Sequence, residues 1–148
     1  QTNGEFEEKF ASRHLNLITS APDHTLFIEA DGRRLWRVLE NLYNNAFKYA
    51  LEGSRIYVDV AEEDSMAVFT IKNMSSNPLN IKAEELTERF VRGDVARTTE
   101  GSGLGLSIAK SLTQLQGGTF EIYIDGDLFK VKVAFPVMLA AKQENLAE

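Results

Sequence analysis

Cysteine is absent from this sequence of 148 residues, and proline (three residues) and histidine (two residues) are scarce. Without cysteine the chain can have no disulfide scaffold, no cysteine-ligated zinc site and no catalytic thiol. No apolar run approaches the roughly 20 residues that a membrane-spanning helix requires, and the segment Gln1–Glu8 lacks the apolar stretch of a signal peptide. The net charge of −6 argues against a general affinity for nucleic acid.

What remains has the composition of one globular domain, with 43% hydrophobic and 26% charged residues. Hydrophobic periodicity and turn residues divide it into helices and strands. Helical patterns cover Glu5–Ile18, residues 32–50 after an N-cap at Asp31, Ala83–Phe90 and Gly105–Gln116. Strand patterns cover Thr25–Glu29, Arg55–Val60, Met66–Lys72, Thr119–Ile124 and Leu128–Phe135. This order predicts a two-layer α/β sandwich with a mixed sheet and helices on one face, and residues 92–103 are expected to form a mobile lid.

The predicted long helix carries two lines of side chains. The apolar line, expected to pack on the sheet, consists of Leu35, Leu39, Leu42, Ala46 and Tyr49. Asn41, Asn45 and Lys48 follow a second line at i, i+4 and i+7. Because much of the remaining helix surface is apolar, these polar groups are expected to be enclosed, and a ligand with negative oxygens and a hard cation would satisfy them. The alternative is a solvated face that includes Glu40 and Asn44.

A glycine-rich turn precedes the helix expected at Gly105–Gln116. Glu100–Leu106 reads EGSGLGL, with glycines at 101, 103 and 105. Glycine lets a backbone approach a ligand closely, and the free amides of a helix N-terminus attract anions. The spacing matches neither a Walker A loop nor a Rossmann turn. By itself the turn could equally be a flexible linker, and the preceding Arg92 and Arg97 could be solvated side chains.

Taken together, these segments resemble the ATP-binding domain of histidine kinases. LENLYNNAFKY (residues 39–49) resembles the family's N box, and ERFVRGD (residues 88–94) resembles its F box. GSGLGLSIAK (residues 101–110), followed by Gly117-Gly118, resembles its G2 box. The resemblance implies the Bergerat α/β sandwich that this family shares with gyrase-type and Hsp90-type ATPases, and it implies ATP and Mg²⁺ as cofactors.

By the same resemblance, Asn45 would coordinate the magnesium ion with Asn41 assisting, Lys48 would contact phosphate oxygens, and the Tyr49 ring would pack beside the nucleotide. Arg92 matches the arginine that can reach the terminal phosphate. The residues that would cover the bound ATP are Gly101, Gly103, Leu104 and Gly105.

Two positions depart from related proteins. Asn41 stands where the related ATPases carry a glutamate that activates water, which favours transfer to a protein acceptor over hydrolysis. In the adenine box, usually Asp-x-Gly-x-Gly, Asn73 stands at the aspartate position, Ser75 and Ser76 stand near the first glycine, and Asn77 stands at the second. Asparagine keeps a carbonyl that can accept a hydrogen bond from the adenine amino group, but the charge-assisted bond is lost, at a cost of about 1 kcal/mol or more.

The family's phosphoacceptor histidine lies on a helical dimerisation domain and is followed by an acidic residue. His14 and His24 are not followed by an acid and are expected at the surface. The resemblance therefore implies a monomeric, cytoplasmic donor domain without nucleic-acid or direct membrane contact. Its partners would be a separate histidine-bearing dimerisation domain and, downstream, a response regulator.

We expect a lead-in at residues 1–24, the catalytic domain at residues 25–137 and a tail at residues 138–148. Two other functions fit the same fold. One is an ATPase or serine kinase of the gyrase and Hsp90 superfamily. The other is a scaffold module whose altered adenine box no longer holds nucleotide.

Overall fold

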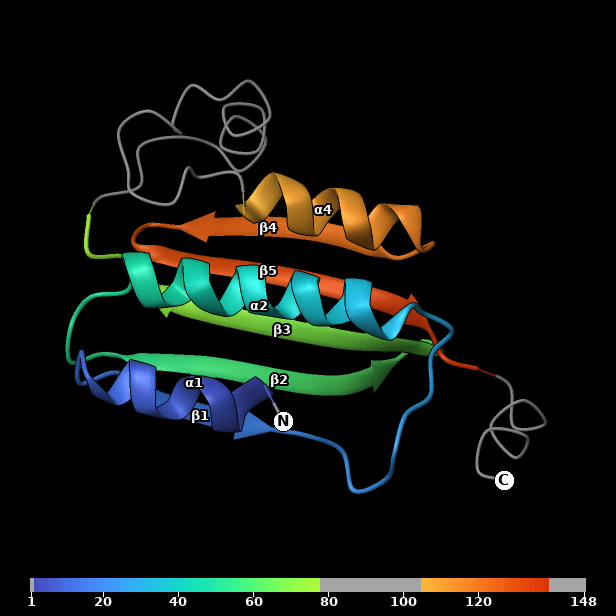
Figure 1. Cartoon of the computed structure of the whole chain (residues 1–148), viewed down its shortest axis with the longest axis horizontal. Coiled ribbons are helices and arrows are strands. Elements are labelled where there is room, and N and C mark those ends of the chain that lie inside the picture. Colours follow the sequence, from blue (N-terminus) through green and yellow to red (C-terminus); the bar gives the residue numbers. More distant parts are fainter. Residues whose placement is uncertain (1, 78–104, 139–148) are drawn as a thin grey trace.

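The computed structural model describes residues 2–77 and 105–138, which form a five-stranded sheet with helices on one face (Figure 1). The helices of this part are α1 (Thr2–Ala11), α2 (Gly32–Tyr49) and α4 (Gly105–Leu115). The strands are β1 (Asn16–Ser20), β2 (Arg55–Glu63), β3 (Met66–Met74), β4 (Thr119–Asp125) and β5 (Leu128–Pro136). Their order is β1-β2-β3-β5-β4, with β1 parallel to β2 and the other pairs antiparallel. The predicted α/β sandwich with a mixed sheet is confirmed.

The first strand lies earlier in the chain than the sequence predicted. Thr25–Glu29 is not a strand, since Ile28 forms only an isolated bridge with Val137. The strand next to β2 is Asn16–Ser20, whose first three residues we had assigned to the helix over Glu5–Ile18. The physical reason is that α1 ends early: His14 takes a left-handed φ of 57°, and the chain leaves the helix there.

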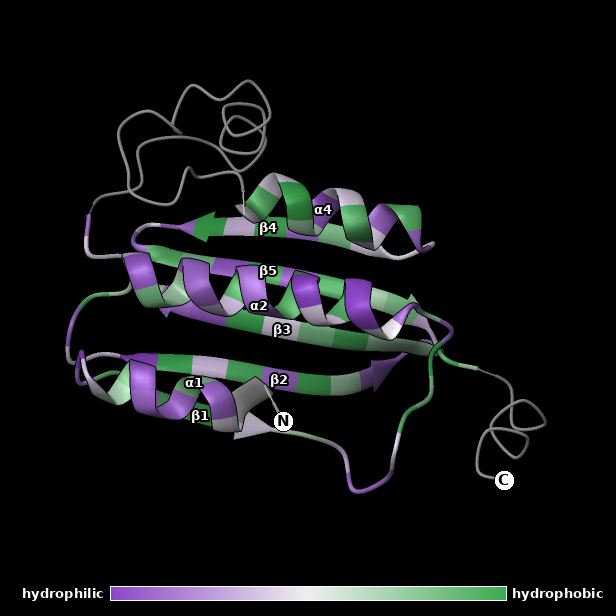
Figure 2. Ribbon diagram, in the orientation of Figure 1, coloured by the Kyte–Doolittle hydropathy of each residue, from purple (hydrophilic) through white to green (hydrophobic). Residues whose placement is uncertain are grey.

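The core lies between the helices and the sheet, and α2 is at its centre. Its buried side chains are Val38, Leu42, Tyr43 and Ala46. The apolar line that we predicted is therefore only partly right, because Leu35, Leu39 and Tyr49 are only partly buried. Tyr43 packs edge-on against Phe6 of α1, and burial raises the pKa of its phenol to about 12. Figure 2 shows hydrophilic residues along the outer sides of α1 and α2.

The lead-in contributes to the same core. Phe6, Phe10 and Leu15 are buried with the side chains of α2 and of the sheet. The boundary that we placed between residues 24 and 25 stays a prediction. Residues 83–90, 92–103 and 139–148, for which we predicted a helix, a lid and a tail, lie outside the described part of the chain. Within residues 2–77 and 105–138, no helix is both long enough and apolar enough to cross a membrane.

The turns follow the predicted chemistry. Between β2 and β3, Asp64 and Ser65 have positive φ angles of 50° and 64°, as a tight hairpin requires. Between β4 and β5, Gly126 has a φ of 61°. Gly118 follows α4 for a different reason, because a Cβ there would come within 2.9 Å of the Ala134 carbonyl oxygen. The positive φ angles thus close the two hairpins, and Gly118 lets the chain after α4 pass close to β5.

The predicted N-cap of α2 is also confirmed. The Asp31 carboxylate accepts hydrogen bonds from the amides of Arg33 (2.9 Å) and Arg34 (3.2 Å). These bonds to the Arg34 and Arg33 amides lower the pKa of Asp31 from its usual 3.8. A carboxyl with a lowered pKa in the folded state stabilises the fold above the unfolded-state value, and this contribution is lost as the pH falls through the folded-state pKa.

We therefore predict that Asp31→Asn, whose amide oxygen can still accept the two bonds, removes this part of the acid sensitivity. The measurement is the urea midpoint of both proteins at about pH 6 and about pH 3. The wild-type chain should lose more stability than Asp31→Asn between these values. An equal loss in both proteins would show that the Asp31 charge does not stabilise the helix.

Candidate functional site

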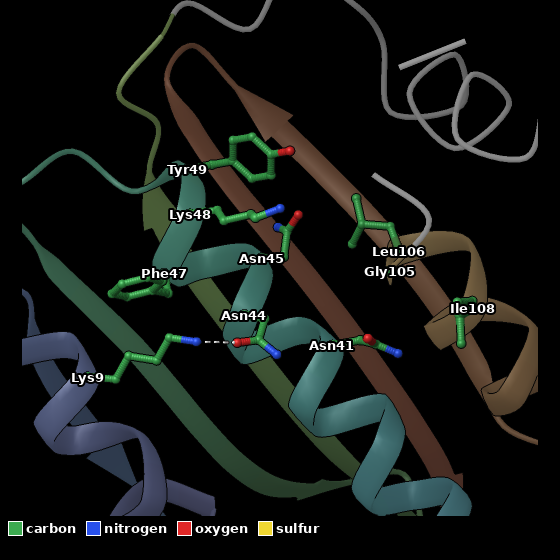
Figure 3. Close-up of a pocket in the computed structure, with 10 residues that line it drawn as sticks. All are labelled: Lys9, Asn41, Asn44, Asn45, Phe47, Lys48, Tyr49, Gly105, Leu106 and Ile108. Carbon is green, nitrogen blue, oxygen red and sulfur yellow. Dashed lines mark hydrogen bonds between the residues drawn. The ribbon is translucent and has the colours of Figure 1, made fainter. Parts of the chain in front are cut away.

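A pocket of about 350 Å³ lies along the C-terminal half of α2 (Figure 3). The residues that line it are Lys9, Asn41, Asn44, Asn45, Phe47, Lys48, Tyr49, Gly105, Leu106 and Ile108. They come from α1, α2 and α4, and the greatest number come from α2. The pocket is therefore built where α2 meets its two neighbouring helices.

The polar line predicted on the long helix lies in this pocket. Asn41, Asn45 and Lys48 all line it, as does Tyr49 at the end of α2. In Figure 3, Asn41 points toward α4, and the side chains of Asn45 and Lys48 end close to each other. The spacing of 4 and 3 residues places them along one side of the helix. The three side chains can thus contact one ligand.

Asn41 and Gly105 bring α2 and α4 close together. A Cβ on Gly105 would lie 3.6 Å from Asn41 Oδ1, which is van der Waals contact, so the start of α4 lies directly beside this amide. Asn41 Nδ2 is buried and has no hydrogen-bond partner in the described part of the chain. Because α4 begins at Gly105, its first-turn amides, which no helical carbonyl can satisfy, lie at the same end of the pocket. The Asn41 amide nitrogen on this side of the pocket is a donor available for an anionic ligand.

Five lining residues were not among the predicted site residues, namely Lys9, Asn44, Phe47, Leu106 and Ile108. Lys9 comes from α1, where its ammonium donates to Asn44 Oδ1 at 2.9 Å and lies 4.7 Å from the centre of the Phe47 ring. We had placed Asn44 only on the alternative, solvated face, and Lys9 only in the lead-in. No local pattern relates Lys9 to residues 44 and 47, because the contact depends on how α1 packs on α2.

The charge of the pocket is opposite to that of the whole chain. Lys9 and Lys48 are the charged residues among the lining side chains of the described part, and no carboxylate is among them. The chain as a whole carries a net charge of −6. Residues 2–77 and 105–138 also hold no group of three or more His, Asp or Glu side chains that could bind a metal ion. A cation in this pocket would therefore need amide and ligand oxygens, and an anion would find two ammonium groups.

Asn73 lies on β3, outside the pocket lining. It is 3% exposed, and its Nδ2 has no hydrogen-bond partner among the described residues. The segment after it is tied to the end of α2, because the Ser76 amide donates to Tyr49 O at 2.8 Å. The Ser75 amide donates to Asp127 O at 2.7 Å, and Ser75 Oγ accepts from the Asn77 amide at 3.3 Å. Asn73 thus places an unsatisfied amide on the strand beside the helix end that carries Lys48 and Tyr49.

The remaining candidates fall into two groups. Arg92, Gly101, Gly103 and Leu104 lie outside the described residues, so their assignments stay predictions. His14 and His24 are exposed, as we expected, and His24 Nε2 lies 3.3 Å from Glu62 Oε2. Neither histidine lines the pocket.

Comparison with known proteins agrees with this arrangement. The model of the histidine kinase-, DNA gyrase B-, and HSP90-like ATPase family matches residues 30–137. Sensor histidine kinase WalK of Bacillus subtilis (strain 168) is 36% identical over 122 residues, which are 80% of this chain and 20% of WalK. The signal transduction histidine-protein kinase BaeS of Escherichia coli (strain K12) is 32% identical over 117 residues, which are 78% of this chain and 25% of BaeS.

Among solved structures, the catalytic domain of histidine kinase ThkA has a TM-score of 0.77 and 25% sequence identity, covering 91% of this chain and 87% of that one. The chain spans only about a fifth to a quarter of the length of the curated relatives WalK and BaeS, but nearly all of the ThkA catalytic domain. The matched part is the part that builds the fold and the pocket. The chain therefore belongs to the histidine kinase-, DNA gyrase B- and HSP90-like ATPase family, as a catalytic domain of the sensor histidine kinase type.

Proposed function

We propose that this domain binds Mg²⁺–ATP in the pocket beside α2 and donates the γ-phosphoryl group to a histidine on a separate dimerisation domain. The observation that carries the proposal is the pocket itself, which collects three amides, two ammonium groups and a helix N-terminus without a carboxylate among its described lining residues. Phosphoryl transfer depends mainly on positioning and on neutralising negative charge. These groups can do both.

The residues present fit the nucleotide and its metal ion. Amide oxygens are ligands that Mg²⁺ accepts, and Asn45 and Asn41 would supply them. When bound, the metal ion would neutralise charge on the phosphates. Lys48 would hold phosphate oxygens, and the buried Asn41 Nδ2, which has no partner among the described residues, could donate to an oxygen of the ligand. Tyr49 would pack beside the nucleotide.

By family resemblance, Arg92 would reach the terminal phosphate. The same resemblance assigns the cover of the nucleotide to Gly101, Gly103, Leu104 and Gly105. Of these five residues, Gly105 alone is among the described residues, where it begins α4 at the edge of the pocket.

The lining favours transfer over hydrolysis. Activating water requires a general base within hydrogen-bonding reach, and an amide such as Asn41 is a poor one. Glu40 is exposed and does not line the pocket. A bound ATP would therefore stay intact until a protein acceptor is present. This argues against the alternative in which the domain is an ATPase.

Asn73 can serve the adenine ring in spite of the missing charge. An asparagine side chain presents one acceptor and one donor side by side, which matches an amino group next to a ring nitrogen on an adenine edge. The Asn73 Nδ2 has no partner among the described residues, so its donor is available for such a pair. This supports nucleotide binding over the scaffold reading.

The acceptor would be supplied by a partner. His14 and His24 are exposed and lie outside the pocket lining. We propose that the acceptor is the histidine-bearing dimerisation domain of the same kinase and that a cytosolic response regulator receives the phosphoryl group next.

Incubation of the chain with γ-labelled ATP and Mg²⁺ tests this function. The chain alone is expected to bind ATP, to release little labelled phosphate and to carry no covalent label. Stable phosphate on the isolated chain, or rapid ATP hydrolysis without an acceptor, would contradict transfer to a separate domain. Binding weaker than about 1 mM would favour the scaffold alternative.

A further inference from the structure

The last turn of α2, which carries Lys48 and Tyr49, ends in carbonyl groups that the helix itself cannot satisfy. Ala46 O accepts from the Ala50 amide at 3.0 Å, and Tyr49 O accepts from Ser76. The Leu51 amide, which would continue the helix by bonding to the carbonyl of residue 47, instead donates to β3, at Met74 O. The carbonyls of residues 47 and 48 are therefore left for another donor.

Arg13 supplies that donor. Its Nη1 donates to Phe47 O and, at 3.4 Å, to Lys48 O, while its Nη2 donates to Ala50 O at 3.0 Å. The planar guanidinium has several donors in a fixed fork, so one side chain can bridge these carbonyls. Its positive charge also suits the negative end of the helix dipole.

The position of Arg13 is itself fixed by the end of α1. The Leu15 amide donates to Phe10 O and the His14 amide donates to Ala11 O, both at 3.0 Å, while His14 takes the left-handed conformation. This is a Schellman arrangement, in which Arg13 is the C-cap residue. The same residue thus ends α1 with its backbone and caps α2 with its side chain.

Ring contacts hold the two helices together at this point. The Phe10 and Phe47 rings stack at 6.2 Å with an interplanar angle of 5°. The Arg13 guanidinium lies 5.4 Å from the centre of the Phe47 ring, and Lys9 lies on the same ring. Figure 3 shows Phe47 and Lys9 on the α1 side of α2, with Lys48 next to Phe47 along the helix.

We propose that Arg13 is a positioning residue for the nucleotide pocket: it fixes the last turn of α2, and through that turn it sets the places of Lys48 and Tyr49. This inference rests on the proposed function of the pocket. Arg13 does not line the pocket. It acts through the backbone of α2. The family match begins at residue 30, so the segment before the matched region also contributes to the nucleotide pocket.

The test compares Mg²⁺–ATP affinity in wild type, Arg13→Gln and Arg13→Lys, with Arg55→Gln as an exposed arginine control. Affinity is measured by calorimetry at a temperature where circular dichroism shows every variant folded. Arg13→Gln should bind about tenfold more weakly, because a misplaced contact costs most of its benefit. Arg13→Lys, which keeps the charge but not the fork, should lose about threefold. Arg55→Gln should bind like wild type.

If Arg13 only stabilises the fold, Arg13→Gln should have a lower urea midpoint but wild-type ATP affinity in the folded protein. That result would overturn the inference. Hydrogen exchange at the Ala50 amide provides a second readout and should be faster in Arg13→Gln than in Arg55→Gln. If Arg13→Gln does not fold, Arg13→Lys decides, and wild-type affinity there overturns the proposal. Absence of ATP binding by the wild-type chain would overturn the proposed function itself, and this inference with it.

Discussion

Asn45→Ala is expected to weaken Mg²⁺-dependent ATP binding by about 100-fold, since loss of groups that hold a metal ion typically costs one to two orders of magnitude. Asn45 lies at the centre of the polar line on α2, between Asn41 and Lys48. Among the described lining residues no carboxylate could take over an oxygen ligand. The substitution should leave the fold intact, because Asn45 is only partly buried and is absent from the hydrophobic core.

The matched control is the neighbouring asparagine. Asn44 also lines the pocket, but its Oδ1 accepts from Lys9 on the α1 side. Asn44→Ala should therefore reduce affinity by no more than about threefold, the loss of one exposed hydrogen bond. Calorimetry with ATP, with and without Mg²⁺, separates the two. Affinity close to wild type in both variants would mean that the polar line is only a solvated helix face.

The second large effect is expected at Asn73. Its amide nitrogen is buried and has no partner among the described residues, which costs about 1–3 kcal/mol of stability. Asn73→Leu removes this group while keeping the same branching of side-chain heavy atoms, so the free energy of unfolding should stay equal or rise. ATP affinity should nevertheless fall by about tenfold, because the adenine edge loses its partner.

This opposite movement distinguishes a binding residue from a structural one. If Asn73 only supported the fold, its substitution would lower the stability of the protein and leave ATP affinity unchanged. Asn73→Asp is the companion variant. It restores the family's carboxylate and should bind ATP more tightly than wild type, by up to about tenfold, while its buried charge lowers the stability of the free protein. Unchanged affinity in Asn73→Asp would reject the idea that the missing charge weakens the site.

Much of this site could be predicted from the sequence because its signals are local. The N-cap at Asp31 and the spacing of Asn41, Asn45 and Lys48 follow from helix geometry alone. The two hairpins follow from alternating patterns and from turn residues such as Gly126. These features depend on residues that are near each other in the chain.

The features that were missed depend on residues far apart in the chain. β1 is five residues long, and Leu17 is its one half-buried residue while the other four are exposed. It therefore has almost no alternation of buried and exposed side chains. Its strand character comes from pairing with residues 55–59, about 40 positions later. The buried side of α2 was misjudged because Tyr43 packs on α1, which the sequence does not place. Lys9 and Arg13 reach the pocket region only through the same packing of α1 on α2.

We propose that the pocket beside α2 is a magnesium-dependent ATP site. Calorimetric titration of the intact chain with ATP, in the presence of Mg²⁺ and again with EDTA, tests it most directly. We expect one site with a dissociation constant below about 1 mM and a loss of affinity of tenfold or more without Mg²⁺. Binding weaker than this with Mg²⁺ present, or binding of equal strength in EDTA, would contradict it.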